Sequence, residues 1–396
     1  MIRFKLRRNL IYLCVYILSW YIRKIDTIIF ENTFDFYPSF IFLFSMTLGE
    51  IFGGLTIYLY QYISLKRKKE SNYFQFLHHL SKEKRVGDHL LKKIVLIFFA
   101  AFFDFMEFVI SAFFISLFDN NISPSFDLRF GAITTIGSSL LCKYALKEKT
   151  GKHHKISQII MGICLCISII LELCFKHDNV SLGKCFVARL LCLLCLICVS
   201  FNDCIEKYLV NTNFMNPFKI LMIEGILEFI MAILLSIGRA PFKDIKKKYE
   251  EKKTGRFVLL IFLLLLYLIL SAVLNSYKIY CNVIYSPMVK SLMDYLLSPF
   301  LCIYYFIKES DFKKNYFFFF MSEFICIVTV FFGCVFNEYI ILFCCGLEHN
   351  TTEEIIGRAS LVENIPTNIA LYDVDGDEEE DCDINDYRIS FKNSKD

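Results

Sequence analysis

The sequence lacks the short motifs that indicate common enzyme chemistries. It contains no GxSxG nucleophile turn, no HExxH zinc-binding helix, no Walker-type phosphate loop and no GxGxxG dinucleotide loop. The His78-His79 and His153-His154 pairs stand in basic segments without carboxylates beside them, so we expect them to be solvated. The chain is therefore predicted not to be an enzyme and to need no cofactor or metal.

Alternation with a period of two, which the strands of a membrane barrel would show, is also missing. Hydrophobic residues instead form long continuous runs. They make up 56% of the 396 residues, Phe alone accounts for 43 of them, and the mean hydropathy is +0.49. Charged residues, at 21%, gather between these runs. Because only helices or closed barrels satisfy the backbone in lipid, we predict an all-α polytopic membrane protein.

Ten apolar runs are candidates for transmembrane helices, which need about 20 residues to cross roughly 30 Å of hydrocarbon. The first, Leu10–Tyr21, is short and flanked by basic residues without a small-residue cleavage site, so we interpret it as an uncleaved span. The other nine are Pro38–Ser64, Ile94–Phe118, Phe130–Leu146, Ile156–Phe175, Cys185–Leu209, Phe214–Ile237, Phe257–Tyr277, Ile284–Ile307 and Tyr316–Phe336.

Lysine and arginine between the runs predict the topology. With the amino terminus in the cytoplasm, the basic segments 1–8, 65–93 and 143–155 lie inside, and ten spans return the carboxyl terminus to the same side. The segment Gly238–Arg256 carries 8 Lys and Arg and falls outside, against the rule. We expect cytoplasmic termini and an endomembrane (Golgi, endoplasmic reticulum or lysosome-like) in preference to the plasma membrane.

The composition divides the chain into three parts. Residues 1–178 and 179–346 each hold five spans, whereas 347–396 carries 14 Asp and Glu against 4 Lys and Arg. This last part is expected to be a disordered cytoplasmic tail, and its acidity suits the recruitment of cytosolic partners. Its DVDGDEEEDCDIND stretch does not match a calcium loop, because Gly376 is at the fourth position and Ile384 replaces the bidentate Glu.

The two five-span parts share a weak sequence similarity. Pro38 precedes Gly49-Glu50 in the first part, and Pro217 precedes Glu224-Gly225 in the second. Five spans in each part, an odd number, predict that the second repeat is inverted relative to the first. Inverted repeats of this kind are typical of secondary transporters.

Ionisable residues inside the runs are candidate functional groups, because each costs about 2.5–3.5 kcal/mol to place at the helix centre. Two neighbouring carboxylates, Glu224 and Glu228, should not both be ionised in a low dielectric. Lys290 and Asp294 could neutralise one another at i,i+4, but Pro287 and Pro299 on either side favour a bent span. We therefore expect Lys290 to face a cavity, with Arg129 as the other cationic contact and Asp104 as its counter-charge from the other half. The candidates for a transport pathway are Glu50, Asp104, Arg129, Glu224, Glu228, Lys290 and Asp294.

Other charges in the runs have an ordinary explanation. Asp203, Glu206 and Lys207 lie within about two turns of the end of their run, where long side chains reach headgroups and water. We interpret these three residues as interfacial.

Several stretches resemble the drug/metabolite transporter superfamily, in its nucleotide-sugar-transporter-like (solute carrier family 35 type, EamA-like) branch. RFGAITTIGSSLLCKYALKEKTGKHHKISQIIMGICL, from Arg129 to Leu165, is similar to a signature of that branch, although Phe130 separates the Arg from the Gly. YSPMVKSLMDYLLSPF is similar to its ninth span, with Lys290 and Asp294 matching. The resemblance covers essentially all of 38–346 and implies a ten-helix inverted repeat with alternating access.

The expected function is secondary active transport of a small polar metabolite across a lipid bilayer, by exchange or proton coupling. The acidic majority among the deep charges favours a neutral or cationic solute. A nucleotide-sugar antiporter stays open as an alternative, as does a non-transporting scaffold or receptor. No nucleic-acid partner is expected, since the basic excess lies in loops flanking apolar runs; a homodimer is left open.

Overall fold

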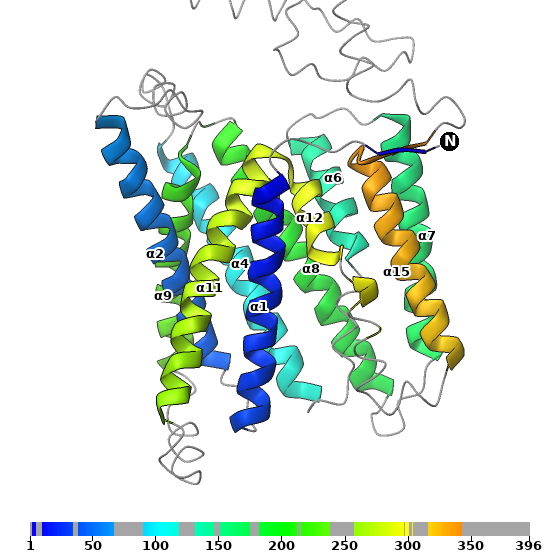
Figure 1. Cartoon of the computed structure of the whole chain (residues 1–396), viewed down its shortest axis with the longest axis horizontal. Coiled ribbons are helices and arrows are strands. Elements are labelled where there is room, and N and C mark those ends of the chain that lie inside the picture. The colour runs from blue at the N-terminus through cyan, green and yellow to red at the C-terminus, as the bar shows by residue number, and fades with distance from the viewer. Residues whose placement is uncertain are drawn as a thin grey trace, which may run out of the picture.

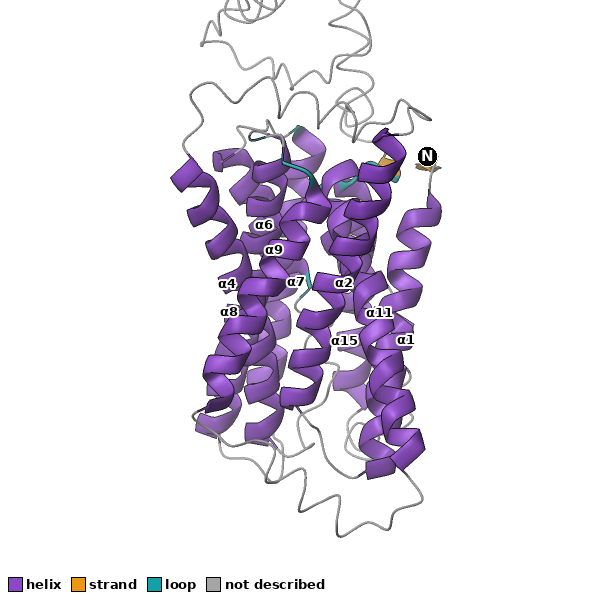
Figure 2. Ribbon diagram, turned by 90° about the vertical axis from the view of Figure 1, so that its left-hand side faces the viewer, coloured by secondary structure: helices purple, strands orange, loops and turns teal. Residues whose placement is uncertain are grey.

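The computed structural model describes residues 2–4, 10–34, 39–66, 90–118, 131–145, 151–174, 182–211, 213, 215–237, 257–296, 298–300, 303 and 316–342. Over this part the protein is all-α, with ten helices lying side by side in one bundle (Figures 1 and 2). The helices are α1 (Leu10–Phe34), α2 (Ser39–Lys66), α4 (Leu90–Phe118), α6 (Ala132–Ala145), α7 (Lys152–Cys174), α8 (Leu182–Asn211), α9 (Pro217–Ile237), α11 (Phe257–Ile284), α12 (Pro287–Tyr295) and α15 (Tyr316–Phe336).

Six of the helices are long and apolar enough to cross a membrane, namely α2, α4, α7, α9, α11 and α15. Many of their large apolar side chains are exposed on the outside of the bundle, where lipid would cover them. The chain is accordingly an integral multi-pass membrane protein. The prediction of an all-α polytopic protein is confirmed at this level.

Each helix corresponds to one of the predicted apolar runs, but three of the helices begin or end at residues that were not predicted. The first run was expected to be short, whereas α1 extends over 25 residues. α11 continues to Ile284, seven residues beyond the predicted end at Tyr277. The ninth predicted span is broken at its start: Ser286 caps α12 by accepting a hydrogen bond from the Val289 amide at 3.1 Å, and Pro287 follows at the first helical position.

The helices pack in a regular scheme. α2 lies between α9 and α11, α4 packs on α8 and α9, and α1 packs on α11. At the other side of the bundle α7 pairs with α15, while α6 packs on α8 and α12. Outside the helices, β1 (Ile2–Phe4) pairs antiparallel with β2 (Ile340–Leu342), which follows α15. The predicted tail, 347–396, lies outside the described residues.

Candidate functional site

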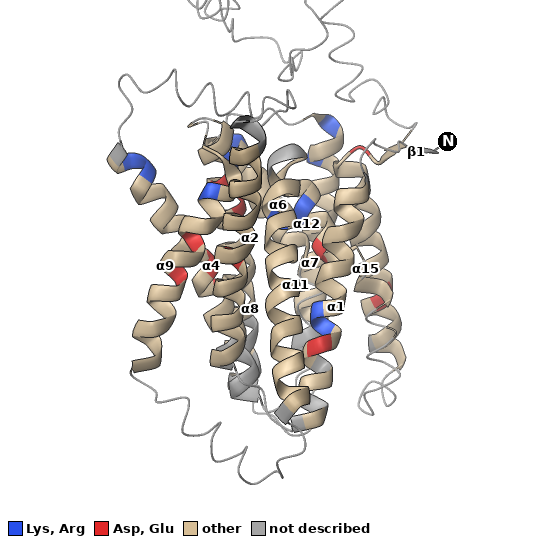
Figure 3. Cartoon of the chain, turned by 60° about the vertical axis from the view of Figure 1, so that its left-hand side comes forward, with Lys and Arg blue, Asp and Glu red and all other residues tan. Residues whose placement is uncertain are grey.

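Charged residues occur part-way along several helices of the bundle, between stretches of uncharged residues (Figure 3). A polar stripe on α11 is at the centre of their arrangement. Ser271, Asn275, Lys278 and Asn282 follow one another at intervals of three or four residues, which places them on one face of the helix. Three of them, Asn275, Lys278 and Asn282, bond to acidic residues of α2, α4 and α8 respectively.

Asp104 on α4 is held by two of these neighbours. Lys278 forms an ion pair with Oδ1 of Asp104, and Asn202 of α8 donates its Nδ2 to the same oxygen at 2.8 Å. The Asn202 Nδ2 also lies 3.4 Å from Oε1 of Glu206, whose Oε2 accepts from Asn282 Nδ2 at 2.8 Å. The three helices α4, α8 and α11 are thereby joined by a continuous polar network with an ammonium group inside it.

Lys290 on α12 forms a second group of ion pairs. Its Nζ lies 3.0 Å from Oδ2 of Asp203 on α8 and 3.1 Å from Oδ2 of Asp294 one turn later. Tyr16 of α1 donates its hydroxyl to Oδ1 of Asp294. Lys290 therefore does more than cancel Asp294, because its other partner, Asp203, is on a different helix and has a fully buried side chain. The expected pairing of Lys290 with Asp104 is wrong, since Asp104 is paired with Lys278.

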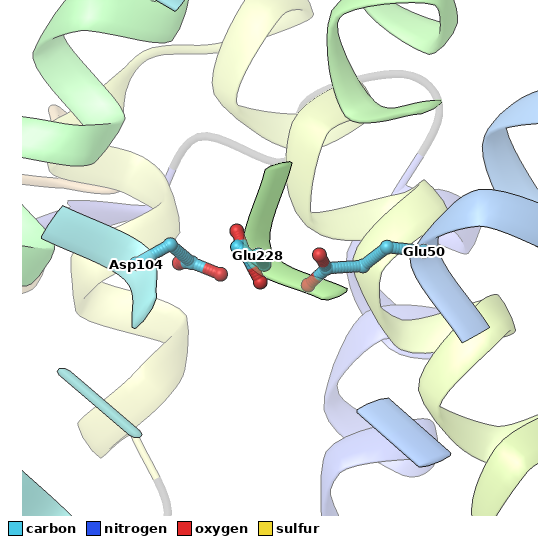
Figure 4. A group of neighbouring side chains, drawn as sticks. All are labelled: Glu50, Asp104 and Glu228. Carbon is cyan, nitrogen blue, oxygen red and sulfur yellow. The ribbon is translucent and has the colours of Figure 1, made fainter. Parts of the chain in front are cut away.

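Glu50, Asp104 and Glu228 bring three carboxylates together from α2, α4 and α9 (Figure 4). One oxygen of each lies within 4.8 Å of the others, and the residues are 2%, 7% and 0% exposed. Asn275 Nδ2 donates to Glu50 Oε1 at 2.7 Å. Among the described residues, no amine, amide or hydroxyl group donates a hydrogen bond to Glu50 Oε2 or to either oxygen of Glu228. Carboxylates this close could hold a cation or share a proton.

Glycines set the short distance between α2 and α9. A Cβ added at Gly225 would lie 2.9 Å from the Cβ of Glu50, and one at Gly54 would lie 2.8 Å from the backbone nitrogen of Met222. Small residues at both contacts let the helix backbones approach closely, as they do in membrane helix pairs. This close approach brings the Glu50 carboxylate to that of Glu228.

The seven residues predicted as candidates do not form one group. Three of them make up the triad just described, and Lys290 with Asp294 belongs to the second group. Glu224 is buried on α9, one turn before Glu228, but lies outside the triad. Arg129 lies outside the described residues.

The interfacial interpretation of Asp203, Glu206 and Lys207 is wrong, because these residues are only 0%, 1% and 7% exposed. α8 continues to Asn211 and is covered by α11 and α12 over this stretch, so the end of the apolar run is not the end of the buried helix. Sequence reasoning also missed Lys278, one residue past the predicted end of its span. The signal that could have revealed it is the polar stripe of α11.

The histidine prediction is also wrong for the second pair. His153 is 5% exposed, and its Nε2 lies 3.3 Å from Oε1 of Glu338, just after α15. The His154 ring packs on Phe336, with the centroids 4.6 Å apart. Both rings thus belong to the contact between α7 and α15. The first pair, His78-His79, lies outside the described residues.

The helices and the buried charges together define a multi-pass membrane protein with a polar centre. No protein-family model matches the chain, and no curated protein matches its sequence.

Proposed function

We propose that this chain is a secondary active transporter that moves a small polar solute by alternating access, built from ten membrane-crossing helices as an inverted repeat. The observation that carries the proposal is the position of the polar site. The first repeat would comprise α1, α2, α4, α6 and α7, and the second α8, α9, α11, α12 and α15. Glu50 and Asp104 are on the first, and their partners Asn275, Lys278 and Glu228 are on the second.

A site between repeats is where alternating access needs its polar groups, since rocking of one repeat against the other exposes it to each side in turn. Buried charge at membrane depth is also costly, so the presence of several such groups is typical of a pathway for a solute or an ion. A scaffold would gain nothing from three clustered carboxylates of which Glu228, and one oxygen of Glu50, lack a donor among the described residues. This contrast favours the transporter over the scaffold or receptor.

The packing of the helices supports the repeat. When the helices of the first set are matched in chain order with those of the second, α2 corresponds to α9, α6 to α12 and α7 to α15. Each of these three pairs is in contact. The contact of α4 with α8 becomes that of α11 with α1, and the contact of α2 with α11 becomes that of α9 with α4; all four occur. Reciprocal contacts of this kind are expected from a two-fold relation between repeats.

The charge of the site favours a neutral or cationic solute. Six carboxylates are buried on four of the helices, namely Glu50, Asp104, Asp203, Glu206, Glu224 and Glu228. Lys278 and Lys290 are each already paired with an aspartate. A nucleotide sugar would need several cationic groups around its phosphates. The resemblance to the nucleotide-sugar-transporter-like branch therefore supports the architecture more than that substrate.

The test is uptake by the purified chain in proteoliposomes, against a panel of amines, neutral polar metabolites and nucleotide sugars. We expect saturable uptake of a cationic or neutral compound, lost in Asp104→Asn. Glu323→Gln is the matched control, because Glu323 is a half-buried carboxylate on α15, which packs on α7. Uptake of nucleotide sugars alone would refute the charge argument. Folded protein that takes up nothing beyond protein-free liposomes would favour the scaffold.

A further inference from the structure

The Glu50 and Glu228 carboxylates face one another across the contact between α2 and α9 (Figure 4). Both side chains are buried. The glycines at the same contact have no side chain, so the two helix backbones can approach closely. The two groups come from opposite sets of helices in the proposed repeat. The distance between the two carboxylates therefore depends on whether the two sets of helices are in contact here.

The hydrogen-bond inventory of the pair is incomplete. Glu50 Oε1 accepts from Asn275, but Glu50 Oε2 and both oxygens of the fully buried Glu228 have no donor among the residues that the structure describes. Two ionised carboxylates would leave three bare oxygens beside each other in a medium of low dielectric. A single proton removes one charge and supplies the missing donor, because a carboxyl group can donate to a neighbouring carboxylate.

The surrounding charges favour the same proton. Asp104 on α4, Glu206 on α8 and Glu224 on α9 are further buried carboxyl groups near the pair. The nearby ammonium group of Lys278 on α11 is engaged by Asp104. The Lys278 ammonium group and the Asn275 amide donor already contact carboxylates of the cluster, which disfavours a metal ion there. The unpartnered Glu228 thus points to a proton as the ligand.

We propose that Glu50 and Glu228 share one exchangeable proton, and that this proton is the coupling ion of the transporter. While the proton is bound, one carboxyl donates to the other and α2 stays against α9. When an aqueous path reaches the site and the proton leaves to water, two like charges repel across the contact. Release of one proton therefore accompanies separation of the helices. The coupling role rests on the proposed transport function, but the proton site itself does not.

The proton is tested without any substrate, by labelling the full chain in lipid nanodiscs with N,N′-dicyclohexylcarbodiimide, which reacts with protonated carboxyls in apolar surroundings. Mass spectrometry then locates the label as a function of pH. We expect label on Glu50 or Glu228 that falls as the pH rises. In Glu50→Gln, the like charge is gone and an amide donor replaces it, so Glu228 should lose its label at a lower pH than in the wild type. Glu228→Gln gives the reciprocal test on Glu50, and Glu323→Gln should change neither.

Three outcomes would overturn the shared proton. The first is no label on either residue at any pH in folded protein. The second is a pH profile of each residue that is the same with and without its partner. The third is suppression of the label by Na⁺ or Ca²⁺ at fixed pH, which would assign the site to a metal ion. A normal labelling profile with no uptake of any solute would remove the transport function and leave the proton site standing. Uptake unaffected by a pH gradient would remove the coupling role alone.

Discussion

Replacing Lys290 by Met tests the buried network most sharply, since it deletes the charge and keeps most of the side-chain volume. The Lys290 side chain is 4% exposed, with Nζ 3.0 Å from Asp203 and 3.1 Å from Asp294. At an effective dielectric constant of 20, unit charges about 3 Å apart attract by about 5.5 kcal/mol. Desolvation offsets much of this, but removing one partner leaves a buried charge uncompensated, which costs about 3–5 kcal/mol.

Lys290→Met should therefore lower the free energy of unfolding by about 3–5 kcal/mol, or roughly 10²–10⁴ in the equilibrium constant. Adding Asp203→Asn should restore most of the loss, because a neutral pair of similar volume costs little. Asp294→Asn alone should cost about 1 kcal/mol or less, since that side chain is 25% exposed and Lys290 keeps Asp203 as its partner.

The protein offers its own reporter for this measurement. Cysteine side chains are buried on several helices and would become accessible to a thiol-reactive dye on unfolding: Cys142, Cys164, Cys192, Cys204, Cys281 and Cys326. Denaturation in mixed micelles can then compare the variants. The ion pair does not stabilise the fold as argued if the free energy of unfolding of Lys290→Met is within about 1 kcal/mol of the wild-type value. The same holds if the effects of Lys290→Met and Asp203→Asn simply add.

Three other outcomes are expected. Gly54→Ala should destabilise the protein by about 1–3 kcal/mol, because its Cβ would meet α9 backbone at 2.8 Å, whereas Gly162→Ala, with nothing within 4 Å, should be neutral or slightly stabilising in the same dye assay. Tyr295→Phe should cost about 1 kcal/mol through its 3.0 Å bond with Thr135, and adding Thr135→Val should cost little more; additive losses would argue against the bond. An epitope fused after Asp396 should bind antibody when only the plasma membrane is permeabilised, and staining confined to cells with opened internal membranes would contradict cytoplasmic termini.

The helices were predictable from the sequence because lipid leaves the backbone few choices. Long apolar runs have to be helical, and the run Tyr316–Phe336 coincides with α15. The ends were less predictable where a charge stands in the helix. Lys278 closes the apolar run by composition, yet α11 continues to Ile284 because Asp104 on another helix receives the lysine. The length of an apolar run indicates how much of a helix faces lipid. The helix can extend beyond the run where other helices supply partners for its polar side chains.

The site was predictable as a set of residue types but not as a set of pairs. Glu50, Asp104 and Glu228 were identified because charge at membrane depth is rare, and they do meet. Sequence spacing instead suggested Glu224 as the neighbour of Glu228, since it is one turn away on the same helix. The relevant neighbour, Glu50, is brought in by the close contact of α2 with α9, which depends on the meeting of two distant segments.

The ion pair between Asp104 and Lys278 has a consequence for the order of events during synthesis. The two residues are separated by 174 positions in the chain. At roughly 5–20 residues per second, a ribosome needs about 9–35 s to add the lysine after the aspartate. For that time α4 carries a carboxylate that has no lysine to receive it, and stable entry into lipid would be penalised. α4 should therefore wait beside the translocon or an insertase, in a wet or protein-lined setting, until α11 arrives and the two are released into the bilayer together.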